Sequence, residues 1–266
     1  MNIFRRELRA YRNSTIIWAF SLSALVMVFL SLFPAFSKDA DVSRKILENL
    51  PLVMRNAIGI SMDNFFNVYG FMSYLFTFVM LAGAVQAMNL GVGILSKEEN
   101  GKTADFLLTK PVSRKKVITN KLLAAVSILI ITNVVFCSVA LLTALKVSTD
   151  SFNIGTFMLI ALKLILTQTM FFTIGFLLSV LIPKIKSSIT VSLPMVFGFF
   201  ITGTIGEILK IDSVKYISPF KFYNSDYIIA NNSYELKFLM IELGFVLAAI
   251  IVSYIIYIKK DIRAAS

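Results

Sequence analysis

Histidine is absent from this chain of 266 residues, and cysteine occurs once, as Cys137. The lack of histidine excludes histidine metal sites, Ser-His-Asp or Cys-His catalysis and histidine proton relays. A single cysteine cannot form an intrachain disulfide. Charged residues are also scarce, at 15% of the chain, whereas 57% is hydrophobic and the mean hydropathy is +0.80. This composition excludes an ordinary soluble domain and indicates a polytopic membrane protein.

Six apolar runs are each long enough to cross a bilayer. A spanning helix needs about 20 mostly apolar residues, because no water is present to satisfy its backbone. The runs cover residues 16–36, 65–95, 117–145, 154–182, 189–209 and 238–258. The first exceeds the usual apolar core of a signal peptide, so we interpret it as a retained helix. We therefore predict an all-α integral membrane protein with six transmembrane helices in a single domain over residues 1–266.

The distribution of basic residues predicts the orientation. With the N-terminus inside, the inner segments hold 16 lysines and arginines and the outer segments hold nine. The positive-inside rule then places both termini in the cytoplasm. Anionic lipid accounts for the pI near 9.7, so we expect membrane lipids rather than nucleic acid as partners. Residues 1–14 form either an interfacial helix on the inner surface or a simple basic flank of the first span.

A stripe of small residues in the second run predicts close helix packing. Gly83, Ala87 and Gly91 recur at every fourth position, which lets another helix approach closely in lipid. Gln86 and Asn89 lie on the same run. They either hydrogen-bond between helices or line a polar path for a substrate.

Lys163 and Glu242 are charged residues inside apolar runs, where a charge is costly. Glu242 is close to the outer interface, so we expect its side chain to extend to the headgroups. Lys163 lies deeper, and it either extends likewise or has a buried partner such as Gln168 or an acidic substrate. Lys163 and Gln168 thus join Gln86 and Asn89 as a possible substrate path.

The outer segment over residues 207–237 is long for a connection and is amphipathic and aromatic. We expect short helices at the outer interface, with four tyrosines at headgroup level, or alternatively an outer gate. These tyrosines are Tyr216, Tyr223, Tyr227 and Tyr234.

The segment between the second and third runs has the pattern of a cytoplasmic docking element. Ser96 and Glu99 have the spacing of a capping box, which predicts a new helix start, and Gly101 then ends that helix. Residues 106–108 are apolar and are followed by Pro111. A passive loop would leave these apolar side chains in water, so we predict that residues 96–116 dock on a partner. The sequence Gly-Lys-Thr at 101–103 is not a phosphate-binding loop, because position 96 is serine rather than glycine.

The same segment resembles that of ABC-2 type transporter permeases. The resemblance rests on residues Ser96, Glu98, Glu99, Gly101, Phe106, Leu107, Leu108, Lys110, Pro111, Val112, Ser113, Arg114 and Lys121. The sequence Ser-Pro-Phe at 218–220, the length and the six runs also agree with that family.

This resemblance implies a permease subunit of an ATP-driven exporter, with no catalytic residue of its own and no bound cofactor or metal. ATP and Mg would be bound by a separate ATP-binding subunit, present in two copies beside a second permease chain of the same or a related kind. The cytoplasmic segment would be a coupling helix in a groove of that subunit. The implied contacts are Glu98, Glu99, Phe106, Leu107, Leu108 and Arg114, and the location is the plasma membrane. The substrate could be a peptide, a drug or a lipid-like molecule.

The sequence also has features that bear on two other classes of protein. An intramembrane protease of the CAAX type would use paired glutamates such as Glu98 and Glu99, but Thr103 replaces the arginine of that motif and the metal-binding histidines are missing. A stand-alone immunity or channel protein, without an ATPase partner, remains the alternative function.

Overall fold

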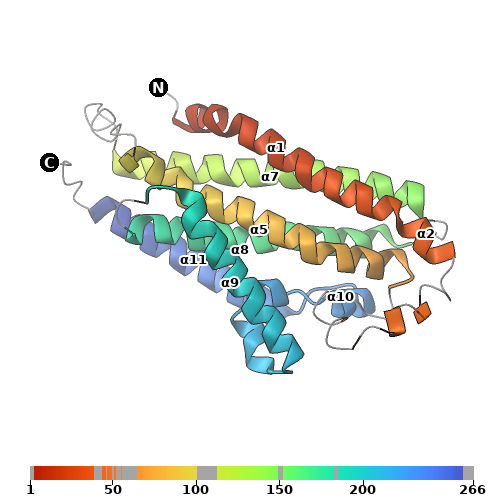
Figure 1. Cartoon of the computed structure of the whole chain (residues 1–266). Helices are drawn as coiled ribbons and strands as arrows, with labels where there is room; N and C mark the ends of the chain where they lie inside the picture. Colours follow the sequence, from red (N-terminus) through yellow and green to blue (C-terminus); the bar gives the residue numbers. More distant parts are fainter. Residues whose placement is uncertain are drawn as a thin grey trace.

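The protein is described here by a computed structural model (Figure 1). The structure describes residues 3–38, 44–45, 47–49, 51, 55, 65–100, 113–148, 152–182 and 185–259. Within these ranges the chain forms helices and turns and contains no strand. The predicted all-α class is therefore confirmed.

Six helices in the described ranges are long and apolar enough to cross a membrane, which confirms the six predicted runs. They are α1 (Ile3–Ser31), α5 (Val68–Asn100), α7 (Arg114–Val147), α8 (Ile154–Leu181), α9 (Ser188–Ile208) and α11 (Leu236–Lys259). Their lengths differ widely, from 21 residues in α9 to 34 in α7. After α1, a turn at Leu32 leads into the short helix α2 (Phe33–Lys38).

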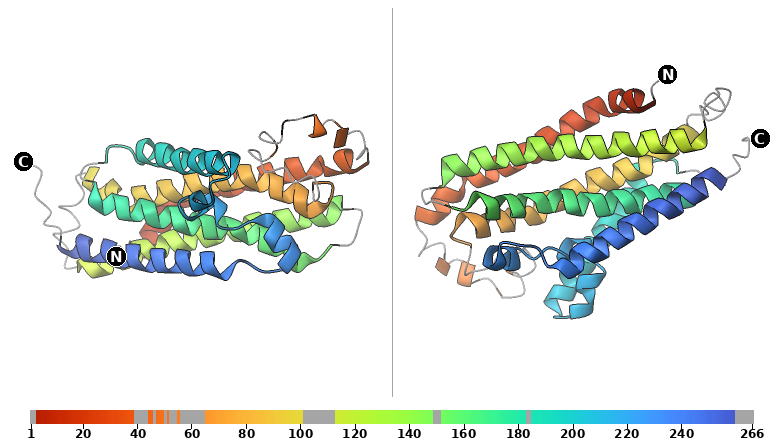
Figure 2. Two further views of the ribbon diagram at one scale, coloured as in Figure 1. Left: turned by 90° about the horizontal axis from the view of Figure 1, so that it is seen from below. Right: turned by 180° about the vertical axis from the view of Figure 1, so that it is seen from behind.

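The bundle is built around α5. This helix makes its largest interface with α8 and also packs on α9, α1 and α7. Helix α1 lies along α7, and α11 packs mainly on α8, as the views in Figure 2 show. The apolar side chains of α9 and α11 are mostly exposed, because these two helices have neighbours on one side only.

The start of α1, the end of α5, the start of α7 and the end of α11 lie at one end of the bundle (Figures 1 and 2). We call it the inner end, after the predicted cytoplasmic side, and the opposite end the outer end. The described part of the predicted interfacial segment, residues 3–14, is continuous with the first span as the single helix α1.

Many serine and threonine residues inside the helices satisfy their hydroxyl groups locally. These donate to the backbone carbonyl of the residue four positions earlier, as do Thr15, Ser31, Ser73, Thr132 and Ser253. This arrangement removes the cost of a free hydroxyl in an apolar environment. Polar residues can therefore occur along the apolar runs without ending the helices.

The segment between α9 and α11 folds back over the outer end of α9. It contains η1 (Asp212–Tyr216), η2 (Pro219–Lys221) and α10 (Ser225–Asn231), so the expected short helices are present. Buried Ser218 fixes the fold-back by donating to the carbonyl of Phe199 at 2.9 Å. Asn232 ends α10 in the left-handed region, with φ of 49°.

The four tyrosines of this segment do not share one environment. Tyr216 and Tyr227 are exposed, whereas Tyr223 is buried and Tyr234 is half-buried. Tyr234 donates to the carbonyl of Leu159 in α8 at 2.6 Å. Burial raises the pKa of the Tyr223 and Tyr234 hydroxyls above the usual range. The common headgroup position predicted for all four is thus wrong for Tyr223, which points into the protein.

Candidate functional site: an outer cavity and an inner helix junction

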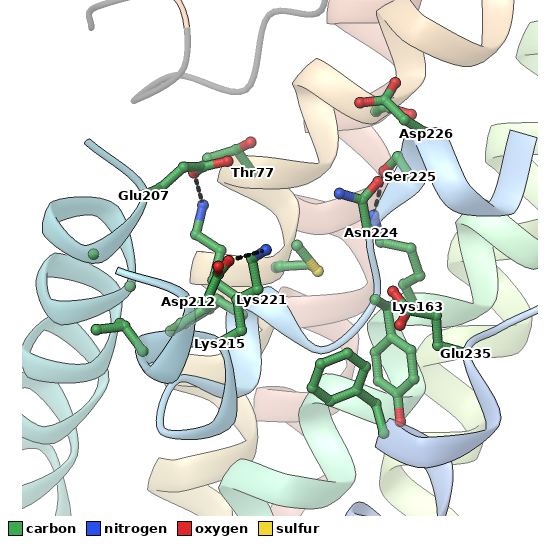
Figure 3. Close-up of a pocket in the computed structure, with 18 of the residues that line it drawn as sticks. Thr77, Lys163, Glu207, Asp212, Lys215, Lys221, Asn224, Ser225, Asp226 and Glu235 are labelled. Carbon is green, nitrogen blue, oxygen red and sulfur yellow. Dashed lines mark hydrogen bonds and ion pairs between the residues drawn. The ribbon is translucent and has the colours of Figure 1, made fainter. Parts of the chain in front are cut away.

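The fold-back of the outer segment encloses a cavity of about 400 Å³ between α5, α8 and α9 (Figure 3). Ser73 and Thr77 line it from α5, Lys163 from α8, and Gly203 and Gly206 from α9. The short helices η1, η2 and α10, the residues that connect them and the start of α11 supply the rest of the wall. The size is that of a small-molecule site.

Lys163 is the buried cation of this cavity. Its side chain is 2% exposed, and its Nζ donates to Ser225 Oγ at 2.5 Å (Figure 3). The same Nζ lies 5.7 Å from the centre of the Phe76 ring, in a cation–π arrangement. Of the two expectations for Lys163, a buried partner is the one observed. That partner is Ser225 of α10, however, and not Gln168.

Ion pairs occupy the outer rim of the cavity. Lys215 pairs with Asp212 at 2.8 Å, and Lys221 pairs with Glu207. The hydrogen bond from Lys215 lowers the pKa of the Asp212 carboxyl, and the pKa of Lys215 is raised by the same bond. The pair of Lys215 and Asp212 is largely exposed, so it contributes little to stability.

Glu242 of α11 does not extend to the outer interface, so that prediction is wrong. The side chain is buried, with the residue 5% exposed, and it accepts a hydrogen bond from the hydroxyl of Tyr223. The fold-back brings Tyr223 into the protein, and this local partner replaces the water or headgroup that the carboxyl would otherwise need. The bond ties the outer segment to α11.

A second polar group lies deeper, between α5, α7 and α8. Gln86 donates to Thr132 Oγ1 at 3.0 Å, and Gln168 donates to Gln86 Oε1 at 3.0 Å. Asn133 donates to Gln168 Oε1 at 2.6 Å. Gln86 and Gln168 are thus engaged in bonds between helices and do not line the cavity, unlike Lys163. Asn89 is half-buried, and its Oδ1 has no hydrogen-bond partner.

The small residues of α5 lie against α8. A Cβ atom on Gly91 would collide with the carbonyl oxygen of Phe172 and lie 2.9 Å from the nitrogen of Phe176. A Cβ atom on Gly83 would collide with the side chain of Leu164. Ala87 is fully buried on the same helix. The glycines therefore allow the close approach of backbones that explains the large interface between α5 and α8.

The structure overturns the capping box at Ser96. Helix α5 continues without a break to Asn100, and the Ser96 hydroxyl donates to the carbonyl of Val92 at 2.7 Å. No helix begins at this position, because the serine is satisfied inside the existing one. Ser113, by contrast, is a true N-cap, accepting from the backbone N–H of Lys116 at 3.4 Å.

Most of the predicted ATPase contacts lie outside the described residues. Phe106, Leu107 and Leu108 belong to the undescribed range 101–112, and the side chains of Glu98 and Glu99 are also outside the description. Arg114 is described, at the first position of α7. Its Nη1 donates to the carbonyl of Ile258 at 3.3 Å, which joins the start of α7 to the end of α11.

The inner end also contains a buried junction that sequence reasoning missed. Lys121 of α7, 1% exposed, donates to the carbonyl of Ile94 in α5 at 2.5 Å and pairs with Glu7 of α1 at 3.4 Å. Glu7 is 7% exposed. Three helices meet at this ion pair, close to both ends of the predicted coupling segment. Little in the sequence signals this pair, since Lys121 lies inside the predicted run 117–145 near its start and Glu7 lies nine residues before the run 16–36.

The fold and the polar sites together indicate the class of protein to which the chain belongs. The described residues contain no group of histidine, cysteine and acidic residues that could hold a metal ion. What they do contain is a six-helix membrane domain with a polar cavity and an ion-paired junction at its opposite ends. These are features of an integral membrane transport component.

The comparison with family models makes the assignment specific. The model of the ABC-2 family transporter proteins matches residues 1–262. The chain belongs to this family and is a multi-pass protein of the plasma membrane. A search of proteins with curated functions finds no match.

Proposed function

We propose that this chain is the transmembrane permease subunit of an ATP-driven exporter, and that a separate subunit binds and hydrolyses ATP with Mg. The observation that carries the proposal is the family match over residues 1–262. In this proposal the chain binds no cofactor of its own. Two ATP-binding subunits act on a pair of permease chains, either identical or related.

The proposed point of contact is the cytoplasmic segment over residues 96–116. Three features support it. Its apolar residues Phe106, Leu107 and Leu108 stand in a stretch that is otherwise rich in charge. The helices on each side of it are fixed to their neighbours, α7 by Arg114 and both helices by Lys121. A displacement of the segment would therefore be transmitted to the bundle rather than lost in a loose connection.

Purification from the native membrane tests the partnership. A tagged chain is expected to bring down an ATP-binding subunit that mass spectrometry identifies from its sequence. Recovery of the chain alone would favour the stand-alone channel or immunity protein and would overturn the proposal.

Mutation of the segment tests the coupling. In reconstituted vesicles, changing both Phe106 and Leu107 to aspartate is expected to abolish substrate-stimulated ATPase activity while the chain remains inserted. Ser148→Asp, which places a single negative charge at the opposite end of α7, is the control. Substrate-stimulated hydrolysis that is unchanged in the double variant would count against the coupling role.

A further inference from the structure

The cavity at the outer end holds a buried lysine that forms no ion pair with the described residues. Lys163 is almost fully buried, and its contacts are one hydroxyl, on Ser225, and one aromatic ring, on Phe76. The described residues provide it with no ion pair. At longer range, the negative charge of Asp226 attracts the ammonium of Lys163 and the positive charge of Lys221 repels it. A buried ammonium is costly unless an anion offsets its charge, and a neutral hydroxyl does not do so.

The acids around the cavity are already engaged. Asp226 has an interaction of its own. The other three lining carboxylates each have a lysine partner, in the pairs Glu207–Lys221, Asp212–Lys215 and Glu235–Lys237. Among the lining lysines, Lys163 and Lys210 have no acid in the described part of the chain. The lining thus holds four lysines and four carboxylates, and Lys163 is the buried lysine for which the described residues provide no ion pair.

The remaining wall is partly apolar. Met80 of α5, Phe220 of η2 and Phe238 of α11 line the same space as Lys163. A ligand that fits this wall has an apolar portion next to its charged end. A volume of about 400 Å³ accommodates a head group and the first part of a chain.

We propose that the outer cavity binds an anionic amphiphile, with the Nζ of Lys163 holding its carboxylate or phosphate group. In the bound state the anion supplies the charge partner that Lys163 lacks, and Ser225 keeps the ammonium directed into the cavity. The shared ligand chemistry has two sources, an anionic phospholipid of the bilayer or a free amphiphile in transit. Binding at this site needs no ATPase, so a binding experiment tests this proposal independently of the proposed exporter function.

Ligand binding to the purified full chain in neutral detergent is the direct test. Fluorescence of dansyl-undecanoate, a fatty acid probe, is expected to saturate and to be displaced by dodecyl phosphate but not by dodecanol. Lys163→Met should weaken binding by roughly tenfold or more, since a charge-assisted hydrogen bond is lost. Lys146→Met, at an exposed lysine of the outer end of α7, is the matched control and should leave the affinity unchanged. Equal affinity in Lys163→Met and the parent chain would overturn the proposal.

The two sources are separated by competition. Displacement of the probe by phosphatidylglycerol, but not by phosphatidylcholine, in lipid nanodiscs would identify a bilayer lipid as the ligand. Displacement by dodecyl phosphate alone would identify a free amphiphile. Either result supports the site, and failure of both anions to compete would refute it.

A measurement of the cavity charge covers the case in which Lys163→Met folds poorly in detergent. Thr77 lines the cavity, and Thr77→Cys in a Cys137→Ala background offers a single thiol there. An anionic methanethiosulfonate should react faster than a cationic one in native membranes, and Lys163→Gln should reduce this preference severalfold. No preference for the anionic reagent, or a preference that survives Lys163→Gln, would contradict the assigned role of Lys163.

Discussion

Removal of the Lys121 side chain should strongly destabilise the inner end of the bundle. Lys121→Met removes two contacts of the ammonium, the 2.5 Å bond to Ile94 and the 3.4 Å pair with Glu7. The Glu7 carboxylate then remains in a site where it is 7% exposed. Breaking a buried pair from one side costs about 3–5 kcal/mol, because the other charge is left uncompensated.

The companion variants separate the ion pair from the rest of this cost. Glu7→Gln leaves the buried ammonium of Lys121 without its anion but keeps an oxygen acceptor for it, so it should cost about 1–3 kcal/mol, less than Lys121→Met. The loss in free energy of unfolding in the double variant should be smaller than the sum of the two single losses by about 1–3 kcal/mol, because neither methionine nor glutamine carries a charge that needs a partner. Lys116→Met, an exposed lysine on the same helix, is the control and should stay within about 0.5 kcal/mol of the parent.

Equilibrium unfolding in mixed micelles measures these differences. The chain has a single tryptophan, Trp18 of α1, so its fluorescence follows the helix that carries Glu7. Trp18 is partly buried and packs against the hydrophobic core, where separation of α1 from α7 would change its environment. A free energy of unfolding for Lys121→Met within about 0.5 kcal/mol of the parent would refute the reasoning. If the losses of stability in Lys121→Met and Glu7→Gln simply add in the double variant, the two side chains are not coupled, and the role assigned to the ion pair would be refuted.

Two further predictions concern packing and the outer segment. Gly91→Leu should lower the free energy of unfolding by about 1–3 kcal/mol or more, because its side chain collides with the backbone of α8, whereas Gly198→Ala, where a Cβ meets nothing within 4 Å, should be neutral in the same unfolding assay. Equal effects at the two glycines would contradict the close contact. Tyr223→Phe should cost about 1–3 kcal/mol, since it leaves the buried carboxyl of Glu242 without its donor, and Glu242→Gln should cost less in the same measurement because an acceptor is retained. A larger loss in Glu242→Gln would exclude this explanation.

The six helices were predictable because the residues within each apolar run are sufficient to indicate a helix. A backbone in lipid must satisfy its amides within the segment, so composition and length suffice to place a span. The predicted run 154–182 and the observed helix Ile154–Leu181 agree almost to the residue. The stripe of Gly83 and Gly91 was readable for a similar reason, since it depends on spacing within one helix.

The partners of the buried charges were not predictable in the same way. Lys163 and Ser225 are 62 residues apart, and Lys121 and Glu7 are 114 apart. Nothing local in the sequence specifies which distant segment folds against such a side chain. Glu242 was assigned to the outer interface for the same reason.

The capping box at Ser96 failed for a different reason. A serine followed by a glutamate three residues later is as compatible with a helix interior as with a helix start. In the interior, the hydroxyl bonds the carbonyl four residues back, as Ser96 does with Val92. Local spacing alone could not distinguish these two arrangements.

The unequal helix lengths have a consequence for how the protein sits in a bilayer. At 1.5 Å per residue, the 21 residues of α9 are about 32 Å long, close to the thickness of the hydrocarbon core, whereas the 34 residues of α7 are about 51 Å long. Containing all of α7 in a 30 Å core would require a tilt of about 54°, beyond the usual range of up to about 40°. Helix α7 must therefore extend beyond the hydrocarbon core, and because the extending part is continuous helix, a force applied to it outside the core can move the rest of α7.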